Sequence, residues 1–133
     1  MKQISVVAAV IECDGKILCM QRGNKGHHYT AMHWEIAGGK IEPGESPQQA
    51  LHREILEEMN LDIIVGEHIA TISHTYPDFH ITLHFYRCRP TTPGIPSFTR
   101  REHIDHCWLA PAQLHSLDWC AADYPLIQLL QSK

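Results

Sequence analysis

The sequence has no excess of positive charge, no long hydrophobic run and no internal repeat. It carries 11 Lys and Arg against 15 Asp and Glu, which gives a formal charge of −4. A protein that coats DNA or RNA needs a basic face, so this balance argues against a nucleic-acid polymer as partner. No apolar stretch approaches the roughly 20 residues that cross a bilayer, which argues against a membrane partner.

The five cysteines and eleven histidines form no recognised ligand spacing. The cysteines are odd in number and scattered, with no Cys-x-x-Cys pair, so we expect neither a disulfide framework nor a zinc knuckle. We expect buried apolar cysteines in a protein of the reducing cytoplasm. The apolar N-terminus contains Glu12 and Asp14 and lacks a basic leader, which favours a strand over a signal peptide.

The length of 133 residues fits a single domain over 1–133. Alternating and β-branched segments predict strands, and polar, glycine-rich or proline-rich segments predict loops. The expected elements are strands over 3–12, 16–21, 63–74, 79–88 and 102–109, a strand and glycine-rich loop over 34–44, loops over 22–33 and 90–99, and helices over 47–59, 111–115 and 121–131. This order predicts an α/β sandwich with a mixed sheet.

The helix predicted over 47–59 has well-defined ends. Ser46 suits the N-cap, Pro47 suits the first helical position, and Gln49 completes a capping box with Ser46. Asn60 tolerates the left-handed conformation that often ends a helix. The apolar side of this helix is expected to comprise Ile55, Leu56 and Met59.

Three glutamates, Glu54, Glu57 and Glu58, fall on the opposite side, and Glu45 lies just before the cap. Arg53, four residues before Glu57, is the local counter-charge. A charge run of this kind is commonly a solvated face. The alternative is a carboxylate cluster for a hard divalent cation such as Mg²⁺, which prefers oxygen ligands and phosphates.

A glycine-rich loop precedes the helix and shifts the balance toward the metal site. Gly38, Gly39 and Gly44 allow the backbone to approach a ligand closely and to offer carbonyl oxygens. Such a loop is weak evidence alone. At a fixed spacing before the glutamates, it favours cation binding over a merely solvated face.

The run GKIEPGESPQQALHREILEEMNL, residues 39–61, resembles the signature box of the Nudix hydrolases. The box is a glycine, five residues, Glu, seven residues, Arg-Glu, an aliphatic, any residue, Glu-Glu, any residue, Gly and an aliphatic. Its places are held here by Gly39, Glu45, Arg53, Glu54, Ile55, Glu57, Glu58, Asn60 and Leu61. The departure is Asn60 in place of glycine, and both residues tolerate positive φ. The resemblance implies the Nudix α/β/α sandwich.

The resemblance also implies an activity and a set of site residues. Nudix hydrolases cleave a nucleoside diphosphate linked to another group and use Mg²⁺ or Mn²⁺. By position, the metal ligands are Gly38, Glu54, Glu57 and Glu58, and the catalytic residues are Glu57, Glu54 and Arg53. Arg53 corresponds to the residue that orients a glutamate. Glu57 is the first choice for the group that takes the proton of the attacking water, and the alternative is that it is a ligand only.

Beyond the box, the chain resembles the MutT-like branch, which converts nucleoside triphosphates to the monophosphate and pyrophosphate. The stretch WEIAGGKIEPGES is similar to CTP pyrophosphohydrolase-like members, in which alanine, here Ala37, precedes the two glycines. The implied substrate is (d)CTP-like or 8-oxo-dGTP-like. The implied substrate-binding residues are Arg22, Glu35, Gly38, Gly39 and Asp123. An exposed strand-end arginine is the alternative for Arg22.

Two acidic residues near the C-terminus extend the resemblance. Glu102 stands six residues before Trp108, as does a glutamate that approaches the metals in MutT-type enzymes, and the alternative is a surface glutamate beside Arg100 and Arg101. Asp123 holds the place of an Asn or Asp that reads the base edge. An ionised carboxylate accepts from cytosine N4 or guanine N1 and N2, and a protonated one can also donate. The alternative is an ordinary helix-start residue, and both roles can hold at once.

Other functions and features stay open at this point. A Nudix hydrolase of ADP-ribose or another nucleoside diphosphate conjugate is one alternative, and a non-catalytic nucleotide-binding sensor domain is another. The implied partner is a nucleotide, and related folds often form homodimers. We expect Tyr76, Phe79 and Tyr86 to pack in the interior.

Overall fold

The computed structural model describes residues 1–132 of the chain. Its strands are β1 (Lys2–Cys13), β2 (Lys16–Arg22), β3 (Trp34–Glu35), β4 (Gly38–Lys40), β5 (Ile63–Thr75), β6 (Phe79–Pro90) and β7 (His103–Leu109). Its helices are α1 (Pro47–Met59) and α2 (Tyr124–Gln131), with a 3₁₀ helix, η1 (Pro111–Ser116), before α2. The strands and α1 match the sequence prediction to within two residues, except in the segment 34–44.

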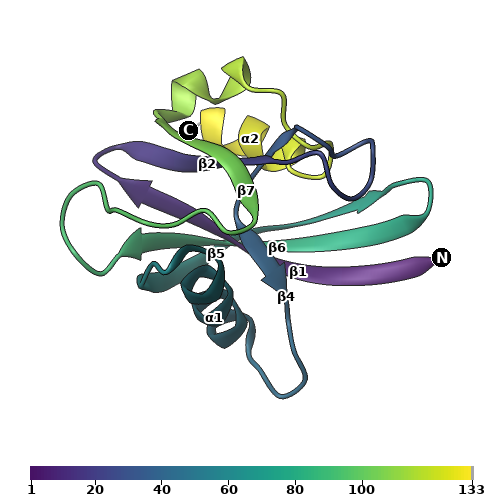
Figure 1. The fold of residues 1–133 in the computed structure, drawn as a ribbon, viewed down its shortest axis with the longest axis horizontal. Coiled ribbons are helices and arrows are strands. Elements are labelled where there is room, and N and C mark those ends of the chain that lie inside the picture. The colour runs from purple at the N-terminus through teal and green to yellow at the C-terminus, as the bar shows by residue number, and fades with distance from the viewer. Residues whose placement is uncertain (133) are drawn as a thin grey trace.

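The strands form one mixed sheet with helices on both faces, which confirms the predicted fold class. The strand order is β3-β2-β1-β6-β5, with β4 paired to β1 and β7 paired to β2. Strands β1 and β6 run parallel, and the other pairs are antiparallel. Helix α1 covers one face, and η1 and α2 cover the other (Figure 1). None of the helices over residues 1–132 has the length and apolar character to cross a membrane.

Strand β1 is buried on both faces and divides the interior into two cores. Successive side chains of a strand point to opposite faces. Val7 and Ile11 accordingly pack in the core beneath α1, whereas Ala8 and Val10 pack in the core beneath α2. The sheet thus separates two faces, each lined by its own helix.

Helix α1 has the predicted ends but a different buried side. The Oγ of Ser46 accepts from the Gln49 N–H at 3.1 Å, the Ser46 N–H donates to Gln49 Oε1 at 2.9 Å, and Asn60 has φ 51°. The prediction that Leu56 is buried is wrong, because this side chain is 43% exposed. The apolar stripe instead consists of Ala50, Leu51, Ile55 and Met59. Spacings of four residues place these on one face, and Leu56 lies beyond its edge.

Two further predictions need correction. Gly38–Lys40 forms strand β4 rather than part of a loop, because the edge of β1 offers it pairing partners from Val6 to Ala8. Helix α2 begins at Tyr124, since residues 121–123 form a turn.

The predicted packing of cysteines and aromatic residues is largely confirmed. Three cysteines are buried, whereas Cys13 and Cys107 are half-buried, and all five are free thiols. The aromatic side chains expected in the interior are also buried; they are Tyr76, Phe79 and Tyr86.

Candidate active site

Two adjacent glycines allow strand β4 to lie close to its neighbours. A Cβ on Gly38 would overlap the backbone of Val7 and Ala8 in β1, so only glycine fits this position. A Cβ on Gly39 would overlap the carboxylate of Glu54 in α1. The two glycines therefore bring β4 against β1 and leave room for an acidic side chain of α1 above the strand.

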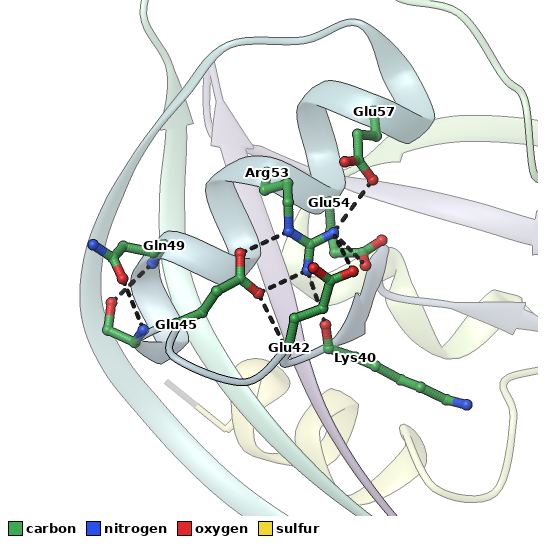
Figure 2. Close-up of polar contacts among 8 residues, drawn as sticks. Lys40, Glu42, Glu45, Gln49, Arg53, Glu54 and Glu57 are labelled. Carbon is green, nitrogen blue, oxygen red and sulfur yellow. Dashed lines mark hydrogen bonds and ion pairs between the residues drawn. The ribbon is translucent and has the colours of Figure 1, made fainter.

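Arg53, in the middle of α1, is the centre of a carboxylate network (Figure 2). Its Nε and Nη2 donate to the two carboxylate oxygens of Glu45 at 2.7 and 2.8 Å. Its Nη1 donates to Glu54 at 3.0 Å and to Glu57 at 3.3 Å, and its Nη2 also donates to the Lys40 carbonyl at 3.2 Å. One guanidinium thus ties the glycine-rich loop to two glutamates of the helix.

Glu45 is fixed on the loop side of this network. Its Oε1 also accepts from the Glu42 N–H at 2.9 Å. The hydrogen bond from Arg53 lowers the pKa of Glu45 to about 2, with the Glu42 N–H contributing. Glu45 therefore stays ionised at every physiological pH, and both of its oxygens are engaged in holding the loop.

Glu54 and Glu58 are the half-buried carboxylates of α1. The Glu54 side chain is 16% exposed, and Oε2 of Glu58 is buried without a hydrogen-bond partner among residues 1–132. Burial, followed by the charges of Glu54, Glu102 and Glu35, raises the pKa of Glu58 to about 8. A crowded set of oxygen donors with an unpartnered buried oxygen fits a hard divalent cation such as Mg²⁺.

Glu102 enters the site from a different element. The preceding segment docks on the end of α1, where the Thr99 N–H donates to the Met59 carbonyl at 2.9 Å and the Arg101 N–H donates to the Glu58 carbonyl at 3.3 Å. Glu102 then lines a cleft of about 580 Å³ together with Glu58. The guanidinium of Arg101 donates to the Glu57 carbonyl rather than pairing with Glu102.

Glu57 lies apart from the other predicted metal ligands. Its side chain is 61% exposed and faces Arg53. Within residues 1–132, one set of three residues brings possible ligand atoms within 4.8 Å of one another. This set is Glu35, Cys120 and Asp123, and it does not include a glutamate of α1. The structure therefore brings Glu58 and Glu102 to one cleft and Glu54 beside Glu58, but it does not draw all four predicted carboxylates to one point. The Glu57 carboxylate instead accepts from Arg53 Nη1 at 3.3 Å, the same nitrogen that donates to Glu54.

A second cavity of about 250 Å³ lies on the α2 side of the sheet and adjoins this cleft. Residues that line both spaces are Arg22, Glu35 and Gly38. All the residues predicted to bind substrate line the cavity; they are Arg22, Glu35, Gly38, Gly39 and Asp123. Cavity and cleft thus adjoin at these shared residues, with Asp123 in the wall of the cavity and Glu58 in the wall of the cleft.

Glu35 is held at the junction by an arginine and a histidine. Arg22 Nη1 lies 3.2 Å from Glu35 Oε1, and Nε2 of the buried His103 lies 2.8 Å from Glu35 Oε2. Arg22 is therefore paired with Glu35 rather than free at the strand end. Sequence reasoning missed His103, although its position directly after Glu102 is a signal that could have found it.

Asp123 is almost fully buried at the end of the cavity. The side chain is 4% exposed, and its Oδ2 accepts from the Ile36 N–H at 3.0 Å. Asp123 is the N-cap residue of α2, but its side chain makes no capping hydrogen bond to the helix. Burial raises the pKa of Asp123 well above its usual value, and the charge of Glu35 adds to this.

Aromatic residues of two loops close the cavity on the far side. The Tyr29 ring stacks on Tyr76 with centroids 4.7 Å apart, and its hydroxyl donates to Asp78. The His27 ring lies 4.8 Å from Phe79, and His27, Tyr76 and Phe79 all line the cavity. The loop after β2 is thereby fixed against the turn between β5 and β6.

Replacing Glu58 with Gln is expected to stabilise the metal-free protein at pH 8.5. The pKa of Glu58 is about 8 in the folded protein against an ordinary value of 4.5. Below pH 4.5 the Glu58 carboxyl is protonated in both the folded and the unfolded protein and does not destabilise the fold. As the pH rises from 4.5 to 8, the unfolded state releases this proton before the folded state does, so the free energy of unfolding falls. The amide cannot ionise, so we expect a gain of about 1 kcal/mol, or about 4 °C in Tm.

Thermal unfolding in EDTA at pH 8.5 and pH 5 measures this difference. The Tm of Glu58→Gln should approach that of the parent protein at pH 5, where the Glu58 carboxyl of the folded parent is protonated. A Glu58→Gln protein that is less stable than the parent at both pH values would show that the carboxylate is not strained in the fold.

Comparison with known proteins gives matches over nearly the whole chain. The NUDIX domain family matches residues 1–130. The CTP pyrophosphohydrolase of Escherichia coli K12 is 39% identical over 140 residues, covering 96% of this chain and 91% of that protein. The 8-oxo-dGTP diphosphatase of the same organism is 34% identical over 134 residues, covering 98% of each chain. The solution structure of the E. coli ORF135 protein superposes with a TM-score of 0.79 at 36% identity, covering 99% of this chain and 91% of that one.

Proposed function

The chain belongs to the NUDIX family, and on that premise we propose that it hydrolyses a nucleoside triphosphate to the monophosphate and pyrophosphate. The proposed substrate is (d)CTP-like or 8-oxo-dGTP-like, in keeping with the names of two relatives that match along nearly their full lengths. The observation that carries the proposal is that the cavity adjoins the acidic cleft, because Arg22, Glu35 and Gly38 line both spaces. The cavity would hold the base of the nucleotide, and the adjoining acidic cleft would hold its polyphosphate with the cation.

The carboxylates of Glu54, Glu57, Glu58 and Glu102 and the carbonyl of Gly38 would hold Mg²⁺, or Mn²⁺. A cation held there would neutralise phosphate charge and lower the pKa of a coordinated water. The unpartnered Oε2 of Glu58 supports this assignment, because a buried carboxylate oxygen without a partner is costly.

Glu57 is the proposed acceptor of the proton of the attacking water. It is exposed and ionisable, and Arg53 fixes its position from the side. The same guanidinium contacts Glu54, so Arg53 orients the two glutamates together. Arg53 is therefore a positioning residue in this mechanism.

The base occupies the cavity on the α2 side, where Asp123 recognises its edge. The Ile36 N–H occupies one carboxylate oxygen of Asp123 and leaves the other for the ligand. In its ionised form, the Asp123 carboxylate accepts from an exocyclic amine such as cytosine N4; in the protonated form, which burial favours, it can also donate. Arg22, beside Glu35, lies between the cavity and the cleft and contributes positive charge where the two spaces meet.

A panel of nucleotides tests the proposed reaction. Canonical and oxidised nucleoside triphosphates, together with ADP-ribose, are incubated with Mg²⁺, and pyrophosphate and orthophosphate are scored separately. We expect pyrophosphate from a triphosphate. Release of orthophosphate alone, or turnover of ADP-ribose only, would contradict the proposed bond cleavage.

Changing Asp123 to Asn is expected to alter base preference. The amide keeps an acceptor for the Ile36 N–H but presents a donor to the cavity. A donor suits the O4 of uracil better than the N4 amine of cytosine. The ratio of kcat/KM for CTP to that for UTP should fall by about 5- to 150-fold, the equivalent of about 1–3 kcal/mol for one base contact.

Asp118→Asn is the matched control, because Asp118 is an exposed aspartate that pairs only with His33 outside the cavity. Its CTP to UTP ratio should stay at the parental value. An unchanged ratio in Asp123→Asn would remove Asp123 from base recognition.

Three broader assignments complete the proposal. We place the protein in the cytoplasm, in keeping with five unpaired thiols among the described residues. We treat residues 1–133 as one domain. Association into a homodimer is a prediction that size-exclusion chromatography with light scattering checks.

A further inference from the structure

Two cysteines face each other across strands β2 and β7. The antiparallel pairing places Cys19 directly opposite Cys107. The flanking pairs, Leu18 with Trp108 and Met20 with His106, keep the same register. Both thiols are free, and each affects the titration of the other through a thiol–thiol contact.

The geometry of this pair matches that of a disulfide. Directly opposed residues of antiparallel strands have Cα atoms about 4.5–5.5 Å apart. Disulfides join Cα atoms about 4.4–6.8 Å apart. Opposed side chains also project from the same face of a sheet, here into the core beneath α2. A bond between the two sulfurs requires no change in strand register.

The other cysteines have no such partner. Cys88 in β6 pairs with Ile11 and Val65, and Cys13 in β1 pairs with Lys16. Cys120 lies outside the strands, in the wall of the cavity. Cys19 and Cys107 are therefore the pair that the sheet itself aligns.

We propose that Cys19 and Cys107 form a reversible cross-strand disulfide when the protein meets a peroxide. The thiolate of Cys107 attacks the peroxide, the O–O bond breaks, and Cys107 becomes a sulfenic acid, while hydroxide leaves and takes up the proton that the thiol lost to give water. The thiolate of Cys19 then displaces hydroxide, which leaves as water after protonation, and the S–S bond forms. In sum, two thiols and one hydrogen peroxide give one disulfide and two waters.

The order of the two steps follows from access. Cys107 is half-buried, whereas Cys19 is 0% exposed, so the peroxide reaches Cys107 first. Burial raises the pKa of both thiols. Because the thiolate is the reactive form, oxidation is slow at neutral pH and accelerates as the pH rises.

The bond would connect the two strands that carry the junction of the candidate site. Strand β2 ends at Arg22 and β7 begins at His103, and both side chains contact Glu35. The register of the pair shifts between Gln21 and Arg22, close to the junction. The disulfide would thus lie where β2 and β7 pair in regular register, two residues before the shift at Gln21 that leads to the candidate site.

Peptide mapping of the oxidised full chain tests the proposal without reference to activity. The folded protein is treated with hydrogen peroxide at pH 7 and pH 9, blocked with N-ethylmaleimide and digested with trypsin and chymotrypsin. Trypsin releases Cys19 in peptide 17–22, and chymotrypsin cuts between Cys107 and Cys120. We expect a peptide pair that joins Cys19 to Cys107, lost on treatment with dithiothreitol and formed faster at pH 9.

Cys13→Ser is the matched control, because Cys13 is a half-buried strand cysteine like Cys107. The joined peptides should persist in Cys13→Ser and disappear in Cys107→Ser, with Cys107→Ala as a second variant if serine disturbs the fold. Oxidation of Cys107 to sulfinic acid without a cross-link, or a cross-link that survives in Cys107→Ser, would overturn the proposal.

Discussion

Glu57→Gln is expected to lower kcat by about 10²- to 10⁴-fold, the range that a positioned general base contributes. Nucleotide affinity should change little, because the base cavity and the half-buried carboxylates are untouched. Glu57 is exposed and meets the protein mainly through Arg53, so the amide fits the same place without disturbing α1. Single-turnover kinetics with Mg²⁺ and nucleotide binding by calorimetry measure the two effects separately.

Glu42→Gln is the control for Glu57→Gln. Glu42 also lies near Arg53, at 3.8 Å, but it belongs to the loop before α1. Its kcat should stay within about threefold of the parent, a difference below 1 kcal/mol. Equal kcat values for Glu57→Gln and Glu42→Gln would contradict the proton-acceptor role, and a parent with nucleotide affinity but no turnover would indicate a sensor domain.

Arg53→Met is expected to reduce kcat/KM by about 10- to 100-fold, the usual effect of removing a group that orients metal ligands. The loss follows from the contacts, since Arg53 donates to Glu45, Glu54 and Glu57 at 2.7–3.3 Å. Without the guanidinium, Glu45 loses its partner on the loop and the glutamates of α1 repel one another. The Mg²⁺ concentration that gives half-maximal activity should rise.

Arg87→Met is the matched control for Arg53→Met. Arg53→Lys tests whether the site needs the two parallel N–H donors of a guanidinium. Arg87 also bridges two carboxylates, those of Glu12 and Glu67, but it lies away from the cleft. A lysine keeps the charge but cannot donate to Glu45 with two parallel hydrogen bonds. Equal Mg²⁺ requirements in Arg53→Met and Arg87→Met would contradict the orienting role.

Local sequence rules predicted α1 and the strands because the relevant interactions are short-range. The ends of α1 depend on Ser46, Gln49 and Asn60, which lie within or next to the helix and act through adjacent backbone groups. The glutamate strip depends on helical spacing alone. Neither feature needs knowledge of the rest of the chain.

Sequence rules fail or fall short where the structure depends on contacts between segments that are far apart in the chain. Leu56 is exposed because the sheet contacts the 51–55–59 stripe, and the helical period does not say where that stripe ends. Strand β4 forms because β1 offers an edge. Asp123 contacts Ile36, and His103 contacts Glu35, across separations of 87 and 68 residues. Such long-range pairings leave no periodic signal in the sequence.

Anomalous diffraction from crystals soaked with Mn²⁺ and a non-hydrolysable CTP analogue tests the central claim most directly. We predict Mn²⁺ peaks bound by the carboxylates of Glu54 and Glu58 and by phosphate oxygens, with the base in the cavity beside Asp123. Carboxylates of α1 that bind no cation and face bulk solvent, while the nucleotide occupies the cavity, would contradict the account.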